Sequence, residues 1–244
     1  MKPIGINEIQ NLTHAVQYFQ DCYLVSSIGA LAKSSNGRKI LAQNIAHTED
    51  GYRIKFRNIN GITKDFFASE KESQDLIYMD KYLNPIPIDP SKPHNPIIKA
   101  IEVAMNKLLK AYPSKKPWIC RVPKCNERFE FNKPSNFLEM FTGQKPISIN
   151  ENNLSLSLKG KKEVSLDLFN KIKDNPDNSF VMGSSFGFYH GISNTHCYSV
   201  KDINPKYNTI DLFDHRLLRT ITLTFDEAIR HMKFIVGYFN KDLT

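Results

Sequence analysis

The spacing of the apolar residues changes along this chain, and that change limits the folds it can adopt. Apolar residues recur at helical spacing in residues 22–32 and again over one face of residues 96–112. In the last third of the chain they gather instead into short runs typical of strands, at residues 179–186, 196–203, 208–213 and 233–239. Helices that dominate the first half and strands that dominate the second predict an α+β fold.

Capping and turn residues mark the ends of several of these elements. Asn95 is placed to cap the helix of residues 96–112, and Pro113 ends it. Asn60-Gly61 is a strong turn signal and predicts a hairpin over residues 52–68.

Further helices are predicted from the same kinds of signal. Asn36-Gly37 is expected to end the first helix, after which residues 38–47 are expected to form a second one. Thr224 and Glu227 have the spacing of a capping box. Helical patterns are also present in residues 135–141, 165–174 and 226–232.

Composition and charge indicate which kinds of binding partner and which compartment to expect. The net charge is +8, but the lysines are spread along the chain and no basic run is interleaved with aromatic residues, so we expect no nucleic-acid partner. No apolar stretch approaches the roughly 18 residues of a membrane span. The first residues, MKPIGINEIQNLTH, lack the apolar core of a signal peptide, so we expect a cytoplasmic or other reducing compartment, with export by a route that needs no such signal left open.

The four cysteines are expected to be free thiols. Cys120 and Cys125 flank four residues, a spacing that suits neither a zinc site nor a redox C-x-x-C pair. Neither a metal nor a cofactor is therefore expected.

Cys22 is the candidate nucleophile. It follows Asp21, a good N-cap residue, in the stretch FQDCYLVSSIGALA, so it takes the first helical position. The unpaired N–H groups and positive dipole end of a helix favour a thiolate there. The alternative interpretation is a small buried apolar side chain.

A cysteine nucleophile needs a base, and the base needs an orienting partner. His196 begins one predicted strand and Asp214 ends the next, so an antiparallel pairing would bring them together. The alternatives to His196 are His190, His215 and His231; Asp211 is an alternative to Asp214, but at three residues' distance it points to the other face of the strand.

Three sequence blocks resemble the protease core of calpains, within the papain-like cysteine peptidases. DCYLVSSIGALA is similar to the nucleophile helix, and SFVMGSSF followed by THCYSVKDI is similar to the histidine block. TIDLFD followed by LTFDEAIRHMKFIVGYF is similar to the strand of the third catalytic residue and the closing helix and strand. PIIKAIEVAMNKLLKAY and PSNFLEMFTG are similar more weakly, so the resemblance covers nearly the whole chain.

The resemblance implies a single catalytic domain, residues 1–244, with a papain-like two-lobe fold. The helical lobe would take about residues 1–145 and carry Cys22 as nucleophile. The β-rich lobe, about residues 146–244, would carry His196 as general acid and base and Asp214 as its orienting partner. The implied activity is that of a cysteine endopeptidase on protein or peptide substrates, through a thioester.

The chain departs from the family in several places. Asp214 stands where the family has asparagine, and His215-Arg216 stand where an aromatic residue follows it. The oxyanion-hole glutamine of the family lies six residues before its cysteine, where this chain has Val16. Gln17 is the preferred substitute and Gln20 the alternative. No acidic cluster matches the calcium-binding loops of calpains, so calcium is not expected.

Two other functions fit the same residues. A transglutaminase or a glutamine deamidase would use the same triad and thioester, and a catalytically weak scaffold would keep the fold for binding. Cys197 is expected to be structural, because alternation along a strand would turn it to the face opposite His196.

Overall fold

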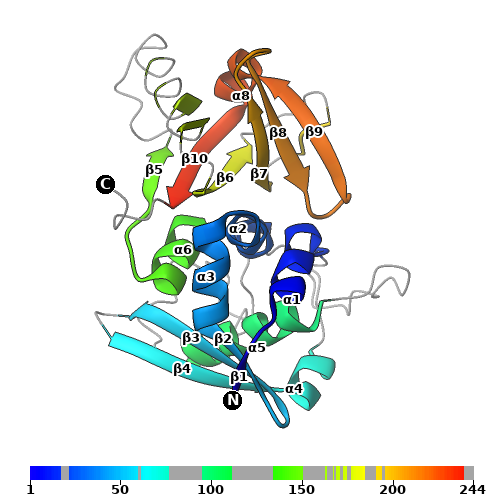
Figure 1. Cartoon of the computed structure of the whole chain (residues 1–244), viewed down its shortest axis with the longest axis vertical. Helices are drawn as coiled ribbons and strands as arrows, with labels where there is room; N and C mark the ends of the chain where they lie inside the picture. The colour runs from blue at the N-terminus through cyan, green and yellow to red at the C-terminus, as the bar shows by residue number, and fades with distance from the viewer. Residues whose placement is uncertain are drawn as a thin grey trace, which may run out of the picture.

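The structure is a computed structural model of the chain, and it combines helices with two antiparallel sheets (Figure 1). It describes residues 1–17, 22–59, 62–76, 95–111, 134–150, 177–184, 191–193 and 196–238, together with residues 163, 167, 169–170 and 173–174. The α+β fold class is confirmed, because every strand pairing among these residues is antiparallel and helices pack against both sheets.

The first sheet has four strands in the order β1-β2-β3-β4. Its strands are β1 (Lys2–Pro3), β2 (Ile45–Thr48), β3 (Gly51–Ile59) and β4 (Ile62–Ser69). The predicted hairpin is confirmed as β3 and β4, while the Asn60-Gly61 turn lies outside the described residues. The helix expected over residues 38–47 is wrong in its last residues, which form β2.

Helices lie between this sheet and the second one (Figure 1). The described helices up to residue 142 are α1 (Ile6–Asn11), the 3₁₀ turn η1 (Leu12–His14), α2 (Cys22–Lys33), α3 (Ser35–Asn44), α4 (Glu70–Gln74), α5 (Pro96–Ala111) and α6 (Pro134–Thr142). Of these, α4 follows the end of β4 and lies away from the second sheet (Figure 1). Helix α2 occupies the middle of the molecule, and all its residues from Tyr23 to Ala32 are buried. A helix that is buried on every side must pack against several elements at once.

The end of α2 differs from the prediction made from Asn36-Gly37. The helix ends at Lys33, and the Ser34 hydroxyl then caps α3 by accepting a hydrogen bond of 3.0 Å from the Gly37 N–H. A Cβ on Gly37 would lie 2.1 Å from the Leu31 carbonyl oxygen. Glycine at this position therefore permits close approach of two helices, and it lies inside α3 instead of ending a helix.

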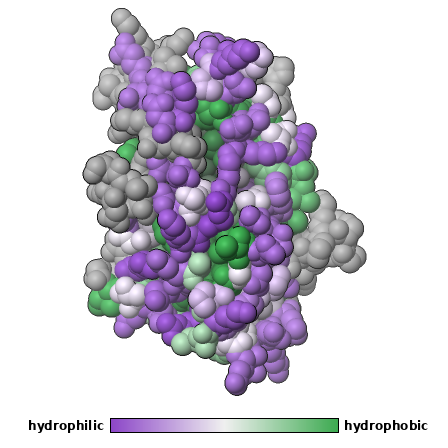
Figure 2. Space-filling view, viewed as in Figure 1, coloured by the Kyte–Doolittle hydropathy of each residue, from purple (hydrophilic) through white to green (hydrophobic). Residues whose placement is uncertain are grey.

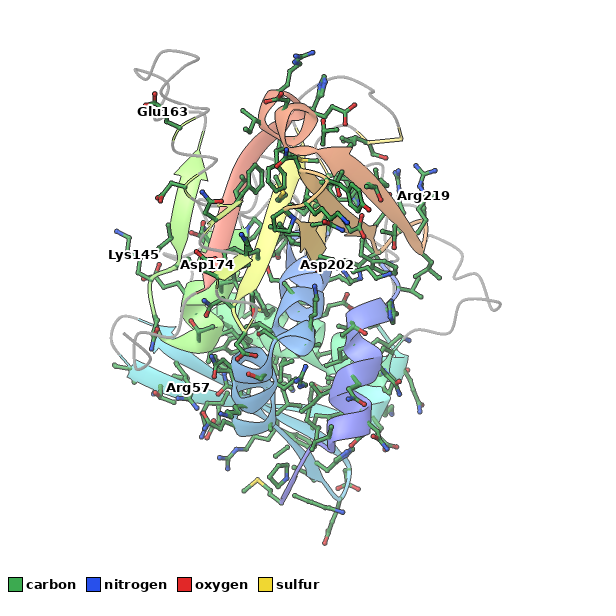
Figure 3. All side chains as sticks on the ribbon, turned by 45° about the horizontal axis from the view of Figure 1, so that its top comes forward. Arg57, Lys145, Glu163, Asp174, Asp202 and Arg219 are labelled. Carbon is green, nitrogen blue, oxygen red and sulfur yellow. The ribbon has the colours of Figure 1, made fainter. Side chains whose placement is uncertain are left out.

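The second sheet has six strands in the order β5-β10-β6-β7-β8-β9. Its strands are β5 (Ile147–Asn150), β6 (Ser179–Ser184), β7 (Cys197–Asn204), β8 (Thr209–Asp214), β9 (Arg219–Thr224) and β10 (Met232–Tyr238). Strand β10, the last among the described residues, inserts between β5 and β6, while β9 forms an edge, where Figure 3 shows Arg219.

The helical predictions in this half of the chain have mixed outcomes. Helix α8 (Phe225–His231) covers the second sheet, and the predicted capping box of Thr224 and Glu227 is confirmed. The helix expected over residues 165–174 lies largely outside the described residues, although Phe169, Asn170, Lys173 and Asp174 are helical.

Among the residues that the structure describes, two hydrophobic clusters stabilise the fold. The first surrounds α2 and reaches the second sheet through Val181, Cys197 and Val236. The second covers the other face of that sheet and includes Phe225 and Ala228 of α8. With these residues buried, the face drawn in Figure 2 is mostly hydrophilic. Within the described residues, no helix combines the length and the apolar character needed to cross a bilayer.

Candidate active site

Cys22 is the first residue of α2, as predicted from the sequence. Cys22 as a whole residue is partly exposed, whereas the residues that follow it are buried. The predicted cap, Asp21, lies outside the described residues. The position places the Cys22 thiol at the positive end of a central helix, where backbone N–H groups without partners inside the helix favour a negative charge.

His196 and Asp214 meet at one end of the second sheet. Strands β7 and β8 are antiparallel, with Ser199 opposite Phe213, so the start of β7 lies beside the end of β8. His196 immediately precedes β7, and Asp214 is the last residue of β8. His196 Nε2 lies 3.1 Å from Asp214 Oδ1, and the side chains are 6% and 0% exposed.

Backbone N–H groups fix the carboxylate of Asp214. Asp214 Oδ1 also accepts hydrogen bonds from the backbone N–H groups of Arg216 at 2.9 Å and Leu217 at 3.1 Å. Burial raises the pKa of Asp214, but His196 and these N–H groups outweigh burial, and the pKa lies below its usual range. The carboxyl group is therefore ionised at neutral pH and held in one orientation beside the imidazole.

The Cys22 thiol contacts both His196 and the Cys197 thiol. The hydrogen bond with Cys197, aided by the hydrogen bond and charge of His196, outweighs burial and holds the pKa of Cys22 well below its usual range. Burial lowers the pKa of His196, but Asp214 and Cys22 together raise it to about 9. Between these two pKa values the thiol is a thiolate and the imidazole carries a proton, which is the charge state of an activated cysteine.

The ring of His196 is oriented by its neighbours. Its Nε2 faces Asp214, so Nδ1 is the nitrogen left for Cys22. The ring of Tyr198 stands edge-on to that of His196, with centroids 4.8 Å apart. The Tyr198 hydroxyl in turn accepts a hydrogen bond of 2.7 Å from the Ser193 N–H.

Cys197 is buried in the core as predicted, but its contact with Cys22 was not predicted. The residue is 6% exposed, and its thiol lies against Cys22. Alternation along β7 holds, because Cys197 belongs to the cluster around α2 and Tyr198 to the cluster on the other face of the sheet.

The other candidate residues lie elsewhere. The buried ring of His215 places Nδ1 2.8 Å from the Ala15 carbonyl oxygen and Nε2 2.9 Å from Ser199 Oγ. Burial lowers the pKa of His215 to about 4, so the ring is neutral at pH 7. Asp211 accepts a hydrogen bond of 2.6 Å from the Thr222 hydroxyl and lines a surface hollow. His231 belongs to α8, and His190 lies outside the described residues.

Gln17 is held next to the end of β8. Its side chain is buried, and its backbone N–H donates a hydrogen bond of 3.0 Å to the carbonyl of His215, the residue after Asp214. The alternative, Gln20, lies outside the described residues. Gln17 thus stays the candidate oxyanion donor, next to the loop that carries the orienting carboxylate.

Serine hydroxyls tie α2 to the second sheet, and sequence reasoning missed them. Ser26 Oγ donates a hydrogen bond of 2.8 Å to the Cys197 carbonyl, and at the far end of the helix Ser34 Oγ lies 2.7 Å from Ser179 Oγ. Ser26 is four residues after Cys22, so the two share a helix face, a spacing that the sequence already carries.

A glycine lets the helix approach the sheet closely. A Cβ on Gly29 would lie 2.5 Å from His215 Cε1 and 3.5 Å from Ser199 Oγ. The imidazole of His215 therefore packs directly on the backbone of α2, and the hydroxyl of Ser199 completes this contact between helix and sheet. A side chain larger than hydrogen would force the helix away from β7 and the site apart.

No metal site accompanies these residues: within the described ranges, no three or more His, Cys, Asp or Glu side chains are grouped to hold an ion. The comparison with protein-family models gives no match, and the comparison with curated proteins gives none either. The features of this chain that point to a function are therefore the contacts among Cys22, His196 and Asp214 and the resemblance of the sequence blocks.

Proposed function

We propose that this chain is a papain-like cysteine peptidase, with Cys22 as nucleophile, His196 as general acid and base, and Asp214 as orienting carboxylate. The first lobe would supply Cys22 at the start of α2. The second would supply His196 and Asp214 from the adjacent ends of β7 and β8. Protein or peptide chains would be the substrates.

One observation carries the proposal: Cys22 contacts His196, and the other nitrogen of that imidazole lies 3.1 Å from the buried carboxylate of Asp214. A thiol, a base and an orienting carboxylate in this order provide what covalent catalysis by cysteine needs. The pKa of Cys22 is lowered and that of His196 is raised to about 9, as expected for a preformed thiolate and imidazolium pair.

The first half-reaction makes the acyl-enzyme. The Cys22 thiolate attacks the carbonyl carbon of the scissile peptide, and the negative charge moves to the carbonyl oxygen. The backbone N–H of Cys22 and the side-chain amide of Gln17 are the proposed donors to that oxygen. The imidazolium of His196 then gives its proton to the leaving amine, and a thioester remains.

The second half-reaction releases the acid. Neutral His196 takes a proton from a water molecule, whose oxygen attacks the thioester carbon. The carbon–sulfur bond breaks, the carboxylic acid leaves and Cys22 is again a thiolate. Asp214 keeps the imidazole in one orientation through both steps and stabilises its protonated form.

A peptide-based vinyl sulfone probe tests the proposal on the native protein. We expect mass spectrometry to find the probe on Cys22, and His196→Ala to slow that labelling by about 100-fold or more. His47→Ala is the matched control, since His47 lies on β2 of the other sheet, with Nε2 2.9 Å from Glu8 Oε1. A labelling rate that is the same in His196→Ala as in the native protein would contradict the role of His196 as base.

A digest of a peptide mixture then separates hydrolysis from other acyl transfer. New chain ends in the presence of the native protein, absent with Cys22→Ala, support a peptidase. Deamidated glutamine or incorporated amine without new ends would instead identify the transglutaminase or deamidase alternative. If neither kind of product forms, the catalytically weak binding scaffold is the remaining alternative.

A further inference from the structure

Two thiols meet in this site, where the proposed reaction needs one. Cys22 is the first residue of α2 and Cys197 the first residue of β7, and both are free cysteines. Their side chains are in hydrogen-bonding contact. The mechanism above uses the sulfur of Cys22 and assigns no step to the sulfur of Cys197.

The contact is fixed by the fold on both sides. The Ser26 hydroxyl, one helical turn after Cys22, donates a hydrogen bond of 2.8 Å to the carbonyl of Cys197. Cys197 belongs to the hydrophobic cluster around α2, and Cys22 packs against the same cluster. The two sulfurs are therefore neighbours because the helix and the strand are bonded together at this point.

We propose that Cys22 and Cys197 form a reversible disulfide when the protein meets a hydroperoxide, and that this bond switches the site off. The inference rests on the proposed function in taking Cys22 as the reactive thiol. The bond itself needs only the two adjacent sulfurs.

The two thiols have unequal roles because their surroundings differ. Cys22 is partly exposed, so a small oxidant can reach it, and its lowered pKa supplies the thiolate that reacts. Cys197 is 6% exposed and is shielded from the oxidant. Its contact with Cys22, and then burial, raise the pKa of Cys197, so it stays a protonated thiol until Cys22 has been oxidised.

The reaction balances in two steps. The Cys22 thiolate attacks one oxygen of the hydroperoxide; the O–O bond breaks, the second oxygen leaves as water or an alcohol after taking a proton, and Cys22 becomes a sulfenic acid. The Cys197 sulfur then attacks the Cys22 sulfur, and the sulfenic hydroxyl leaves as water with the Cys197 proton. Two thiols lose two electrons in total and the hydroperoxide gains them.

The bond would also protect the site. With its sulfur in a disulfide, Cys22 cannot attack a carbonyl and cannot advance to a sulfinic acid, which is not reversed by thiols. A dithiol reductant restores both thiols by exchange.

Hydrogen peroxide with the full-length protein tests the proposal. Free thiols are blocked after treatment, and the digest is searched for a peptide that links Cys22 to Cys197. We expect that peptide to appear, labelling of Cys22 by the vinyl sulfone probe to be lost, and dithiothreitol to restore it. Cys120→Ser and Cys125→Ser are matched controls that should keep both the link and the recovery.

Cys197→Ser is the decisive variant, and Cys197→Ala replaces it if the serine variant does not fold. Each protein is compared with its own untreated sample. In the variant we expect peroxide to abolish labelling without recovery on reduction, with Cys22 found as sulfinic acid.

Two outcomes separate this inference from the proposed function. If the probe labels untreated Cys22 but peroxide yields no linked peptide and equal sulfinic acid in both proteins, the disulfide is overturned and the peptidase is untouched. If the linked peptide forms although untreated protein neither takes the probe nor cleaves peptides, the disulfide stands and the peptidase falls.

Discussion

Asp214 Oδ1 lies 3.1 Å from His196 Nε2 and also accepts hydrogen bonds from the backbone N–H groups of Arg216 and Leu217. Asp214 Oδ2 has no hydrogen-bond partner among the described residues. A single oxygen thus makes all three of these bonds. An asparagine at this position would keep that oxygen and place its amide where Oδ2 lies.

Substitution of Asp214 should therefore depend on what replaces it. We expect Asp214→Ala to slow labelling of Cys22 by about 100-fold or more, because the imidazole loses its orienting partner. Asp214→Asn should be much milder, since its oxygen still accepts from the ring N–H. Asp211→Ala is the control, because its carboxylate bonds to Thr222. The labelling rate of Cys22 is measured with one probe in all three variants. A large loss of rate in Asp211→Ala would contradict the assigned triad.

The reaction of Cys22 with iodoacetamide should be nearly independent of pH from weakly acidic to neutral solution. The pKa of Cys22 is lowered, so the thiolate is present there, and the imidazolium that stabilises it persists up to the His196 pKa of about 9. In His196→Ala the rate at pH 6 should be far lower and rise with pH. The alkylation rate of Cys22, followed by mass spectrometry across that pH range in both proteins, tests this prediction. A native profile that rises only near the pKa of a free thiol, about 8.5, would exclude the ion pair.

Gln17→Ala should lower kcat for peptide cleavage by about 100-fold with little change in KM, because the lost donor acts on the oxyanion. Alkylation by iodoacetamide passes through no oxyanion and should keep its rate. Gln20→Ala is the matched control for the alternative donor. If Gln20→Ala causes the loss and Gln17→Ala does not, the oxyanion donor is Gln20.

His215 should make the fold sensitive to acid. Burial lowers its pKa to about 4 from an unfolded value of 6.5, so the unfolded chain binds this proton first as the pH falls. The free energy of unfolding should fall between pH 6.5 and pH 4, by about 3 kcal/mol over the whole window and about 2 kcal/mol by pH 5. Urea unfolding of the native protein and of His215→Gln at pH 7.5 and pH 5 measures this. Equal losses in both proteins would assign the acid sensitivity to other groups.

Local signals predicted the elements whose ends are set by neighbouring residues. Helix α5 begins at Pro96, and the Asn95 side chain accepts a hydrogen bond of 2.9 Å from the Ile97 N–H, as expected from a capping residue followed by proline. Helix α8 begins with the predicted capping box. In these cases the bonds that decide the structure join residues two or three positions apart.

Signals failed where distant contacts decide the structure. The pattern around Gly37 predicts the end of a helix. Glycine is needed there instead because α3 packs closely on the Leu31 carbonyl. Strand β5 has only four residues, and its pairing with β10 joins segments more than eighty positions apart. No local pattern carries such a contact.

Part of the candidate site could be predicted from the sequence, and part could not. His196 and Asp214 could be placed together because an antiparallel pair of strands fixes which ends meet. The contact of Cys22 with Cys197 depends on how α2 lies against β7, which the Ser26 hydrogen bond secures across 171 positions.

The position of β10 in the second sheet has a consequence for the order of synthesis. Cys22 is made early, but the sheet that holds His196 and Asp214 is complete only when Met232–Tyr238 has entered between β5 and β6. A chain still growing on the ribosome therefore carries Cys22 before His196 is held beside it. A chain stopped before Met232 should show the alkylation rate of an ordinary thiol, and under the proposed function an abandoned translation product would not digest the proteins around it.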